Sequence, residues 1–283
     1  MKICIVGLGL IGGSLAKAIS ARTDASVVGM DKNGNSLTLA LDEKSIRYVA
    51  TDDDLLKSDV VILAIPPTSI ISFLKENHAK FGKSTLVVDI CGIKRDIMDA
   101  YHRYLKPDGI PFAGMHPMAG REVYGYEHAL VDLFDGASLI IVKDNSVNYE
   151  KTCLQAFEGY MKQIGFRKIV YSTAEKHDEI IAYTSQLAHV VSSAYIKSPS
   201  VYLENGFSAG SFRDLTRVAK LDEFTWTDLF MRNADNLIKE IDEIEKHLED
   251  YRSVLESKDA ESLRELLRDG RERKEWSNTH IHK

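Results

Sequence analysis

The 283-residue sequence has no excess of positive charge. Lys and Arg number 36 against 42 Asp and Glu, and the formal net charge is −6. Without a basic block to offset this balance, neither nucleic acid nor an anionic membrane surface is an expected partner. The longest apolar runs, such as 60–67, are far shorter than the roughly 20 residues that span a bilayer. The N-terminus also lacks the features of a signal peptide. We therefore expect a cytoplasmic protein.

Cysteine is scarce as well. The three cysteines are widely spaced and form no CxxC pair, so a disulfide framework or a cysteine-based metal site is not expected. Apolar residues, in contrast, make up 44% of the chain, which excludes a wholly disordered protein. The length favours two domains of about 150 residues each.

The first 171 residues alternate short β-branched runs with helical stretches. Seven runs, most of them almost uninterruptedly apolar, are predicted to be strands: Lys2–Val6, Ser26–Met30, Val60–Ala64, Leu86–Ile90, Pro111–Gly114, Ser138–Val142 and Lys168–Tyr171. Such runs are typical of strands covered on both faces, and their alternation with helices indicates a mostly parallel sheet. The sequence predicts an α/β, Rossmann-type N-terminal domain over residues 1–171.

Residues 172–283 show helical patterns almost throughout and are predicted to form an all-α domain, broken mainly at 197–210. The segment Thr225–Asp228 has the spacing of a capping box at a helix start. On the following charged helix, apolar residues recur at steps of four and three: Leu237, Ile241, Ile244, Leu248, Tyr251 and Leu255. Such a stripe needs a partner helix, either from the same domain or from a second copy of the chain.

A GxGxxG motif, GLGLIG, follows the first predicted strand and opens a helix. In this context Gly7 allows a tight turn, Gly9 lets the backbone approach a pyrophosphate, and Gly12 lets the helix pack close to the sheet. The helix start at Leu10 and Ile11 then offers free N–H groups to the phosphates. The motif predicts a dinucleotide site.

Asp31 ends the second predicted strand, 24 residues after Gly7. A carboxylate there accepts hydrogen bonds from an adenosine ribose and repels the 2′-phosphate of NADP, so NAD is the expected cofactor. Lys32 follows directly and could tolerate a phosphate. Pro66 comes after the next strand, at the sheet edge where the cofactor would lie.

Two further candidates follow later strands. Lys94 comes after Leu86–Ile90, and the pattern alone fits equally a substrate or cofactor contact and the first turn of a helix. His116 comes after Pro111–Gly114, at the same carboxyl edge as the cofactor. A histidine can take the proton of an alcohol while hydride leaves the same carbon. The residue pattern alone leaves a structural histidine as an equal alternative.

Three segments together resemble the prephenate dehydrogenases, including their arogenate-using relatives: GLGLIGGS at the start, HPMAG in the middle and FRDLTRVA in the helical part. The resemblance covers essentially the whole chain. It implies an NAD-binding Rossmann-type domain followed by a helical domain that forms a homodimer. It also implies oxidative decarboxylation of prephenate to 4-hydroxyphenylpyruvate, on the route to tyrosine, with no metal required.

The resemblance also implies roles for individual residues. His116 corresponds to the family's catalytic histidine, which hydrogen-bonds the ring hydroxyl and accepts its proton. Arg217 matches the arginine that binds the ring carboxylate, and His189 matches a histidine of the substrate pocket. A guanidinium can bind a carboxylate through two hydrogen bonds, and Arg213 lies one helical turn earlier. An ion pair between Arg217 and Asp214 is the alternative.

Two positions depart from the family pattern. Gly92 stands where a serine is common, so a hydroxyl near the reacting centre is lost, and Gln186 stands where many relatives have a histidine. Together with Lys94 and Arg213, these residues complete the expected substrate site. His177 is expected to be exposed rather than catalytic.

The sequence also fits three alternatives. An arogenate dehydrogenase would run the same reaction on a substrate with an amino-acid side chain. A β-hydroxyacid dehydrogenase or imine reductase shares the domain plan but typically has a lysine, not HPMAG, at the catalytic position. A catalytically silent NAD-binding regulator would need neither His116 nor Arg217.

Overall fold

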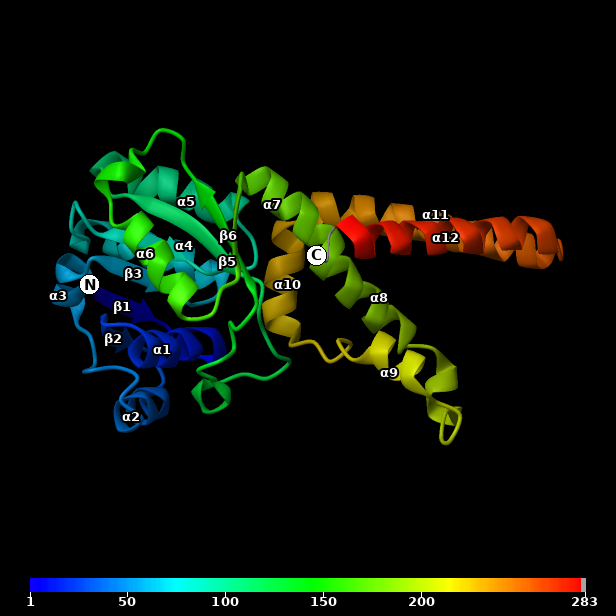
Figure 1. The fold of residues 1–283 in the computed structure, drawn as a ribbon, viewed down its shortest axis with the longest axis horizontal. Helices are drawn as coiled ribbons and strands as arrows, with labels where there is room; N and C mark the ends of the chain where they lie inside the picture. Colours follow the sequence, from blue (N-terminus) through cyan, green and yellow to red (C-terminus); the bar gives the residue numbers. More distant parts are fainter. Residues whose placement is uncertain (281–283) are drawn as a thin grey trace. The chain divides into compact units, whose positions relative to one another are not determined.

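The computed structural model describes residues 1–280 and contains two compact units, Met1–Ala234 and Asp235–Lys283. The first unit holds the sheet and the helices up to α10, and the second holds two long helices (Figure 1).

A seven-stranded sheet forms the centre of the first unit, in the order β2-β1-β3-β4-β5-β6-β7. Its strands are β1 (Lys2–Val6), β2 (Ser26–Met30), β3 (Val60–Leu63), β4 (Leu86–Asp89), β5 (Phe112–Pro117), β6 (Ser138–Lys143) and β7 (Lys168–Ser172). All pairs are parallel except β5 with β6. The predicted strands are confirmed, with one relevant correction. His116 lies inside β5 rather than after it, because antiparallel pairing with Ile140 extends the strand.

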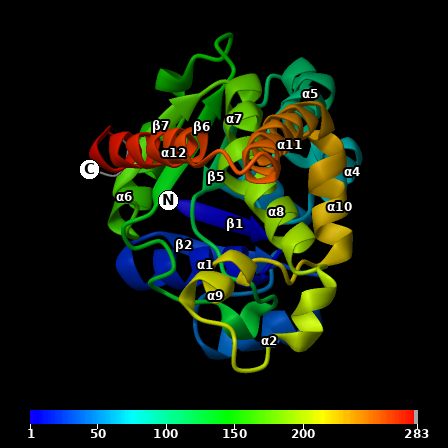
Figure 2. The same ribbon diagram turned by 90° about the vertical axis from the view of Figure 1, so that its right-hand side faces the viewer.

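Helices cover both faces of the sheet (Figures 1 and 2). They are α1 (Leu10–Arg22), α2 (Gly34–Asp42), α3 (Asp52–Lys57), α4 (Pro67–Asn77), α5 (Arg95–Tyr104) and α6 (Leu154–Gln163). In β1, Ile3 and Ile5 pack into one apolar core with α1 and α6. Cys4 and Val6 point to the opposite core, which α4 and α5 cover. This burial on both faces explains why the strands are uninterruptedly apolar.

Four helices follow the sheet in the same unit: α7 (Ala174–Ile181), α8 (Ala188–Tyr195), α9 (Gly210–Thr216) and α10 (Glu223–Arg232). A π-helical segment, Ala182–Leu187, joins α7 to α8. The predicted cap at Thr225 is wrong. Helix α10 starts earlier because Asp222 is its N-cap and accepts a hydrogen bond from the Thr225 N–H at 2.8 Å. Aspartate is a stronger N-cap than threonine.

The second unit consists of α11 (Ala234–Glu256) and α12 (Ala260–His280). The turn between them places Lys258 at a φ of 54°. Helix α11 carries the predicted apolar stripe, and Leu248 and Leu255 on it are about 60% exposed. The predicted fold class, a Rossmann-type domain with a mostly parallel sheet followed by helices, is confirmed. No helix within residues 1–280 is long and apolar enough to cross a membrane.

Candidate active site

The three motif glycines have distinct geometries at the turn between β1 and α1. Gly7 adopts a φ of +95°, which favours glycine. A Cβ at Gly12 would lie 1.9 Å from the Gly7 carbonyl oxygen, so only glycine lets α1 pack this close. Around Gly9, in contrast, no heavy atom of the other described residues, its two chain neighbours excepted, lies within 4 Å of an added Cβ. The turn is therefore tight on its inner side and open at the point where a pyrophosphate would approach.

Asp31 lies beside this turn, at the end of β2. Its Oδ2 accepts a hydrogen bond from the Leu8 N–H at 2.5 Å, and its Oδ1 accepts one from the Asn33 N–H at 2.7 Å. The carboxylate is thus fixed next to the glycine turn. Among the other expected cofactor residues, Leu10 is buried and Ile11 partly buried at the start of α1, while Pro66 is exposed at the N-cap of α4.

His116 is the first member of a chain of three hydrogen-bonded side chains. Its Nδ1 lies 2.9 Å from Nε2 of His177, whose Nδ1 lies 2.7 Å from Oδ1 of Asp178. His116 projects from β5, and the other two residues belong to α7. The expectation that His177 is exposed is wrong: only 2% of it is accessible. It is buried because α7 packs against α5.

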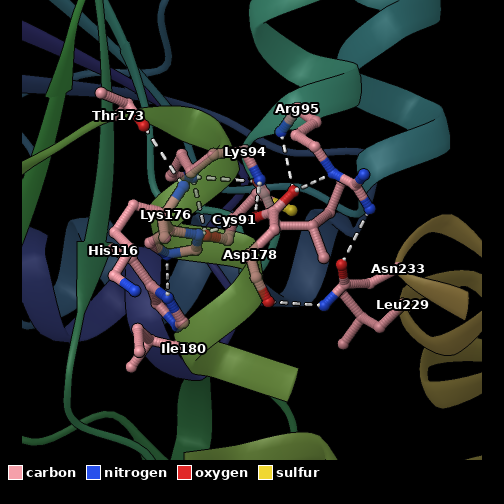
Figure 3. A network of polar contacts seen from close by, with 12 residues as sticks. Cys91, Lys94, Arg95, His116, Thr173, Lys176, Asp178, Ile180, Leu229 and Asn233 are labelled. Carbon is pink, nitrogen blue, oxygen red and sulfur yellow. Dashed lines mark hydrogen bonds and ion pairs between the residues drawn. The ribbon is translucent and has the colours of Figure 1, made fainter. Parts of the chain in front are cut away.

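Asp178 is fixed at the far end of this chain. Its Oδ1 accepts from the Lys94 N–H at 2.8 Å and its Oδ2 from the Arg95 N–H at 2.9 Å, at the start of α5 (Figure 3). Burial alone would raise its pKa, but hydrogen bonds from His177 and these N–H groups hold the pKa below its usual range. Burial lowers the pKa of both His116 and His177. Near neutral pH the chain therefore holds a carboxylate and two neutral imidazoles.

Of the two alternatives for Lys94, the structure shows the helix start, because Lys94 is the N-cap of α5. Its side chain is fully buried, because its ammonium donates to Oδ2 of Asp89 at 2.5 Å and to the carbonyl oxygens of Cys91 and Ile93 at 2.8 and 3.2 Å. A Cβ at Gly114 would lie 2.8 Å from Lys94 Cδ, so this glycine makes room for the lysine. Lys94 instead anchors the loop after β4.

Gly92, in that loop, lies beside the catalytic candidate. A Cβ added there would lie 3.9 Å from Nε2 of His116 and 3.5 Å from Cδ2 of Leu229. Gln186 is placed differently from the expectation of a substrate contact. It is 2% exposed, donates to the Leu229 carbonyl at 3.3 Å and accepts from Nδ2 of Asn233 at 2.8 Å. The π-helical segment turns Gln186 towards α10, where these bonds satisfy its amide.

His189 is half-buried on α8 and contacts the segment that follows α9. Its Nδ1 lies 3.2 Å from the Val218 carbonyl oxygen, so Nδ1 is the donor. Its ring lies 3.9 Å, centre to centre, from the ring of Trp226. Burial lowers its pKa, and the charge of Arg217 acts in the same direction. His189 is therefore a neutral ring next to the arginine.

Arg217 forms an ion pair with Glu122, from the loop after β5, rather than with Asp214. Its side chain is 65% exposed, and Arg213 is also exposed, on α9. The structure thus brings Gly92 to His116, and His189 to the segment carrying Arg217. Glu122 connects that segment to the strand of His116.

Three residues of the site were missed by sequence reasoning: His177, Asp178 and Glu122. The first two are neighbours in a helix that begins one residue after Thr173, its N-cap. An adjacent histidine and aspartate are too common for a specific signal. Nothing in the sequence indicated that the pair would meet a strand 61 residues earlier.

Two family models match the chain in succession. The model of the prephenate dehydrogenase nucleotide-binding domain matches residues 15–171, and that of the prephenate dehydrogenase dimerization domain matches residues 173–269. A prephenate dehydrogenase of Bacillus subtilis (strain 168) is 28% identical over 273 residues, which cover 92% of this chain and 72% of that protein. A cyclohexadienyl dehydrogenase of Zymomonas mobilis is 28% identical over 276 residues, covering 94% and 92%.

A solved structure shares the fold over nearly its full length. The crystal structure of prephenate dehydrogenase from A. aeolicus, in complex with hydroxyphenyl propionate and NAD+, has a TM-score of 0.85 and 27% sequence identity. The match covers 97% of each chain. With both domain models matched in order, the chain belongs to the prephenate dehydrogenase family and is a dehydrogenase.

Proposed function

We propose that this protein catalyses the NAD-dependent oxidative decarboxylation of prephenate to 4-hydroxyphenylpyruvate, a step in tyrosine biosynthesis. Arogenate is the second candidate substrate, since an arogenate dehydrogenase from Synechocystis shares this fold with a TM-score of 0.81. The observation that carries the proposal is the placement of His116: its Nδ1 is bonded to His177, while its Nε2 would lie 3.9 Å from a Cβ added at Gly92.

The residues at the β1–α1 turn fit a dinucleotide. Gly9 leaves open space where a side chain would block a pyrophosphate, and the start of α1 offers backbone N–H groups to it. Asp31 directly follows β2 and has a fixed carboxylate, suited to the two ribose hydroxyls of NAD and repulsive to a 2′-phosphate. When bound, NAD supplies the hydride acceptor.

His116 handles the proton of the reaction. As hydride leaves the ring carbon that carries the hydroxyl, Nε2 takes the hydroxyl proton. Loss of CO2 then makes the ring aromatic, and Nε2 returns the proton to the ring oxygen. The net change is loss of a hydride and of CO2, with no net proton released. Aromatisation drives the step, so the protein mainly supplies position, a base and complementary charge.

Arg217 binds the ring carboxylate in this proposal. The substrate is a dianion, and an exposed guanidinium already paired with Glu122 can exchange that partner for a substrate carboxylate. His189 holds its Nδ1 proton towards Val218 and so keeps its other ring nitrogen free for the substrate side. Arg213 adds positive charge on α9 without a direct role in the reaction.

We also propose that the protein forms a homodimer, and that its two domains span residues 1–171 and 172–283. The second matched family domain, residues 173–269, is described as a dimerization domain. The exposed apolar residues Ile238, Leu248 and Leu255 on α11 support association through that part of the chain.

The test is a steady-state assay of NADH formation. Prephenate and arogenate are each offered with NAD and with NADP. Turnover of prephenate with NAD, at a higher kcat/KM than any other combination, is the expected result. Preference for arogenate would select the second candidate, and no turnover of either substrate would refute the proposal.

A further inference from the structure

We propose that His177 and Asp178 are positioning residues that hold His116 in the tautomer with its proton on Nδ1, leaving Nε2 as a free acceptor. The inference rests on the proposed function of His116 as the base. The hydrogen-bond donors and acceptors along the chain of contacts determine which nitrogen of this neutral ring carries the proton.

The carboxylate of Asp178 defines the direction of the chain. Both of its oxygens accept backbone N–H groups, from Lys94 and Arg95, so its orientation is fixed by the start of α5. An ionised carboxylate can only accept hydrogen bonds. Nδ1 of His177, 2.7 Å from Asp178 Oδ1, must therefore carry a proton and donate it.

The tautomer of His116 follows in one further step. A neutral imidazole has one N–H and one lone pair. Since His177 carries its proton on Nδ1, its Nε2 offers a lone pair to Nδ1 of His116 at 2.9 Å. Nδ1 of His116 is then the donor, and its Nε2 is unprotonated. The opposite tautomer of His116 would set two lone pairs against each other in a buried place, leaving both unsatisfied.

This arrangement has a consequence for the reaction. When Nε2 of His116 takes the hydroxyl proton, the ring becomes positive and its Nδ1–H still donates to His177. The negative Asp178, at the far end of the hydrogen bonds, compensates that charge, and no proton needs to move along the chain. We assign His177 and Asp178 no contact with substrate or cofactor. They act through His116.

Two variants of His177 separate this role from packing. In His177→Gln, the side-chain oxygen can take the place of Nε2 and accept from Nδ1 of His116. In His177→Leu, a side chain of similar size offers no acceptor. The matched control is His102→Leu, which removes the histidine of another His–Asp pair, His102–Asp144 at 2.9 Å, on α5.

The first readout is long-range 1H–15N NMR of the full-length protein with 15N-labelled histidine, which reports which ring nitrogen carries the proton. We expect His116 as the Nδ1–H tautomer in the wild type, in His177→Gln and in His102→Leu, and a change towards Nε2–H in His177→Leu. A wild-type His116 protonated on Nε2 would overturn the inference. This measurement needs no substrate, so it stands even if the proposed activity fails.

The second readout is turnover with prephenate and NAD. His177→Leu should lose about a hundredfold in kcat, the lower range of a general-base contribution, with NAD affinity unchanged. His177→Gln should recover most of that loss. Equal turnover in both variants would overturn the positioning role. If His177→Leu fails to fold, the wild-type NMR spectrum and the turnover of His177→Gln still test the positioning role. Loss of activity in a folded His177→Gln that retains the Nδ1–H tautomer of His116 would contradict this role.

Discussion

Gly92 and His116 face the same space: a Cβ added at Gly92 would lie 3.9 Å from Nε2 of His116. With His116 as the proposed base, we expect a substrate hydroxyl that donates to Nε2 to occupy this space. The proposed base thus places the reacting end of the substrate next to Gly92, and the size of the side chain at residue 92 should control access to Nε2.

We expect Gly92→Val to lower kcat/KM for the substrate by about a hundredfold or more, because its γ-carbons would fill the space in front of Nε2. Gly92→Ala is the matched control, since its Cβ contacts, 3.5 Å to Leu229 and 3.9 Å to His116, are ordinary. Steady-state kinetics and NAD titration measure the effect. Wild-type kinetics in Gly92→Val would place the reacting centre elsewhere.

Arg217 is expected to act in binding rather than in stability. Arg217→Gln should raise the KM for the substrate by about ten- to a hundredfold, the loss of hydrogen bonds to a charged group. Its exposed ion pair with Glu122 contributes little to stability. Glu122→Gln is the control, because it keeps the guanidinium and removes only its partner. A lower Tm with unchanged KM in Arg217→Gln would show a structural ion pair instead.

Lys94 supports the site from inside the protein. Lys94→Met would leave Asp89 buried without its ionic partner, and we expect a loss of about 3–5 kcal/mol in the free energy of unfolding. The double variant Asp89→Asn with Lys94→Met removes both charges and should recover part of that loss. Denaturant unfolding of the single and double variants measures both changes in the free energy of unfolding. A loss in the single variant below that of an ordinary surface substitution would mean that the ion pair does not anchor the loop.

The acid limb of the pH profile should report His116. Burial, with the nearby His177 and Lys94, lowers its pKa well below the usual 6.5. A base must be neutral to accept a proton, so kcat/KM for the free enzyme should be insensitive to protonation of His116 down to pH 6.5 and fall only below it. The free energy of unfolding should change with pH in the same direction. Because the pKa of His116 is lower in the folded protein, its contribution to stability is fully present above pH 6.5 and is lost as the pH falls through the lowered pKa. An acid limb at or above pH 6.5 would contradict the lowered pKa of His116.

Much of the fold was predictable because local pattern and tertiary environment agree. The seven apolar runs are strands because helices cover both faces of the sheet, as the cores around Ile3 and Cys4 show. The glycine turn between β1 and α1 was equally predictable from the sequence. At Gly12 the required absence of a Cβ has a direct structural cause, the carbonyl oxygen of Gly7.

The substrate side was less predictable because its contacts join segments far apart in the chain. The burial of Lys94 depends on Asp89 and on the space left by Gly114, neither of which marks the lysine in the sequence. Gln186 turns inward because a π-helical segment breaks the spacing assumed for a regular helix. Likewise, only the fold brings His177 to His116.

The most direct test of the role of His116 as the base compares the wild type with His116→Asn in the same assay of NADH formation. We expect this substitution to lower kcat with prephenate and NAD by about 10²–10⁴-fold. NAD affinity and Tm should stay close to those of the wild type, because the Gly7–Gly12 turn does not depend on His116. Unchanged turnover in His116→Asn would contradict the assignment of this imidazole as the base.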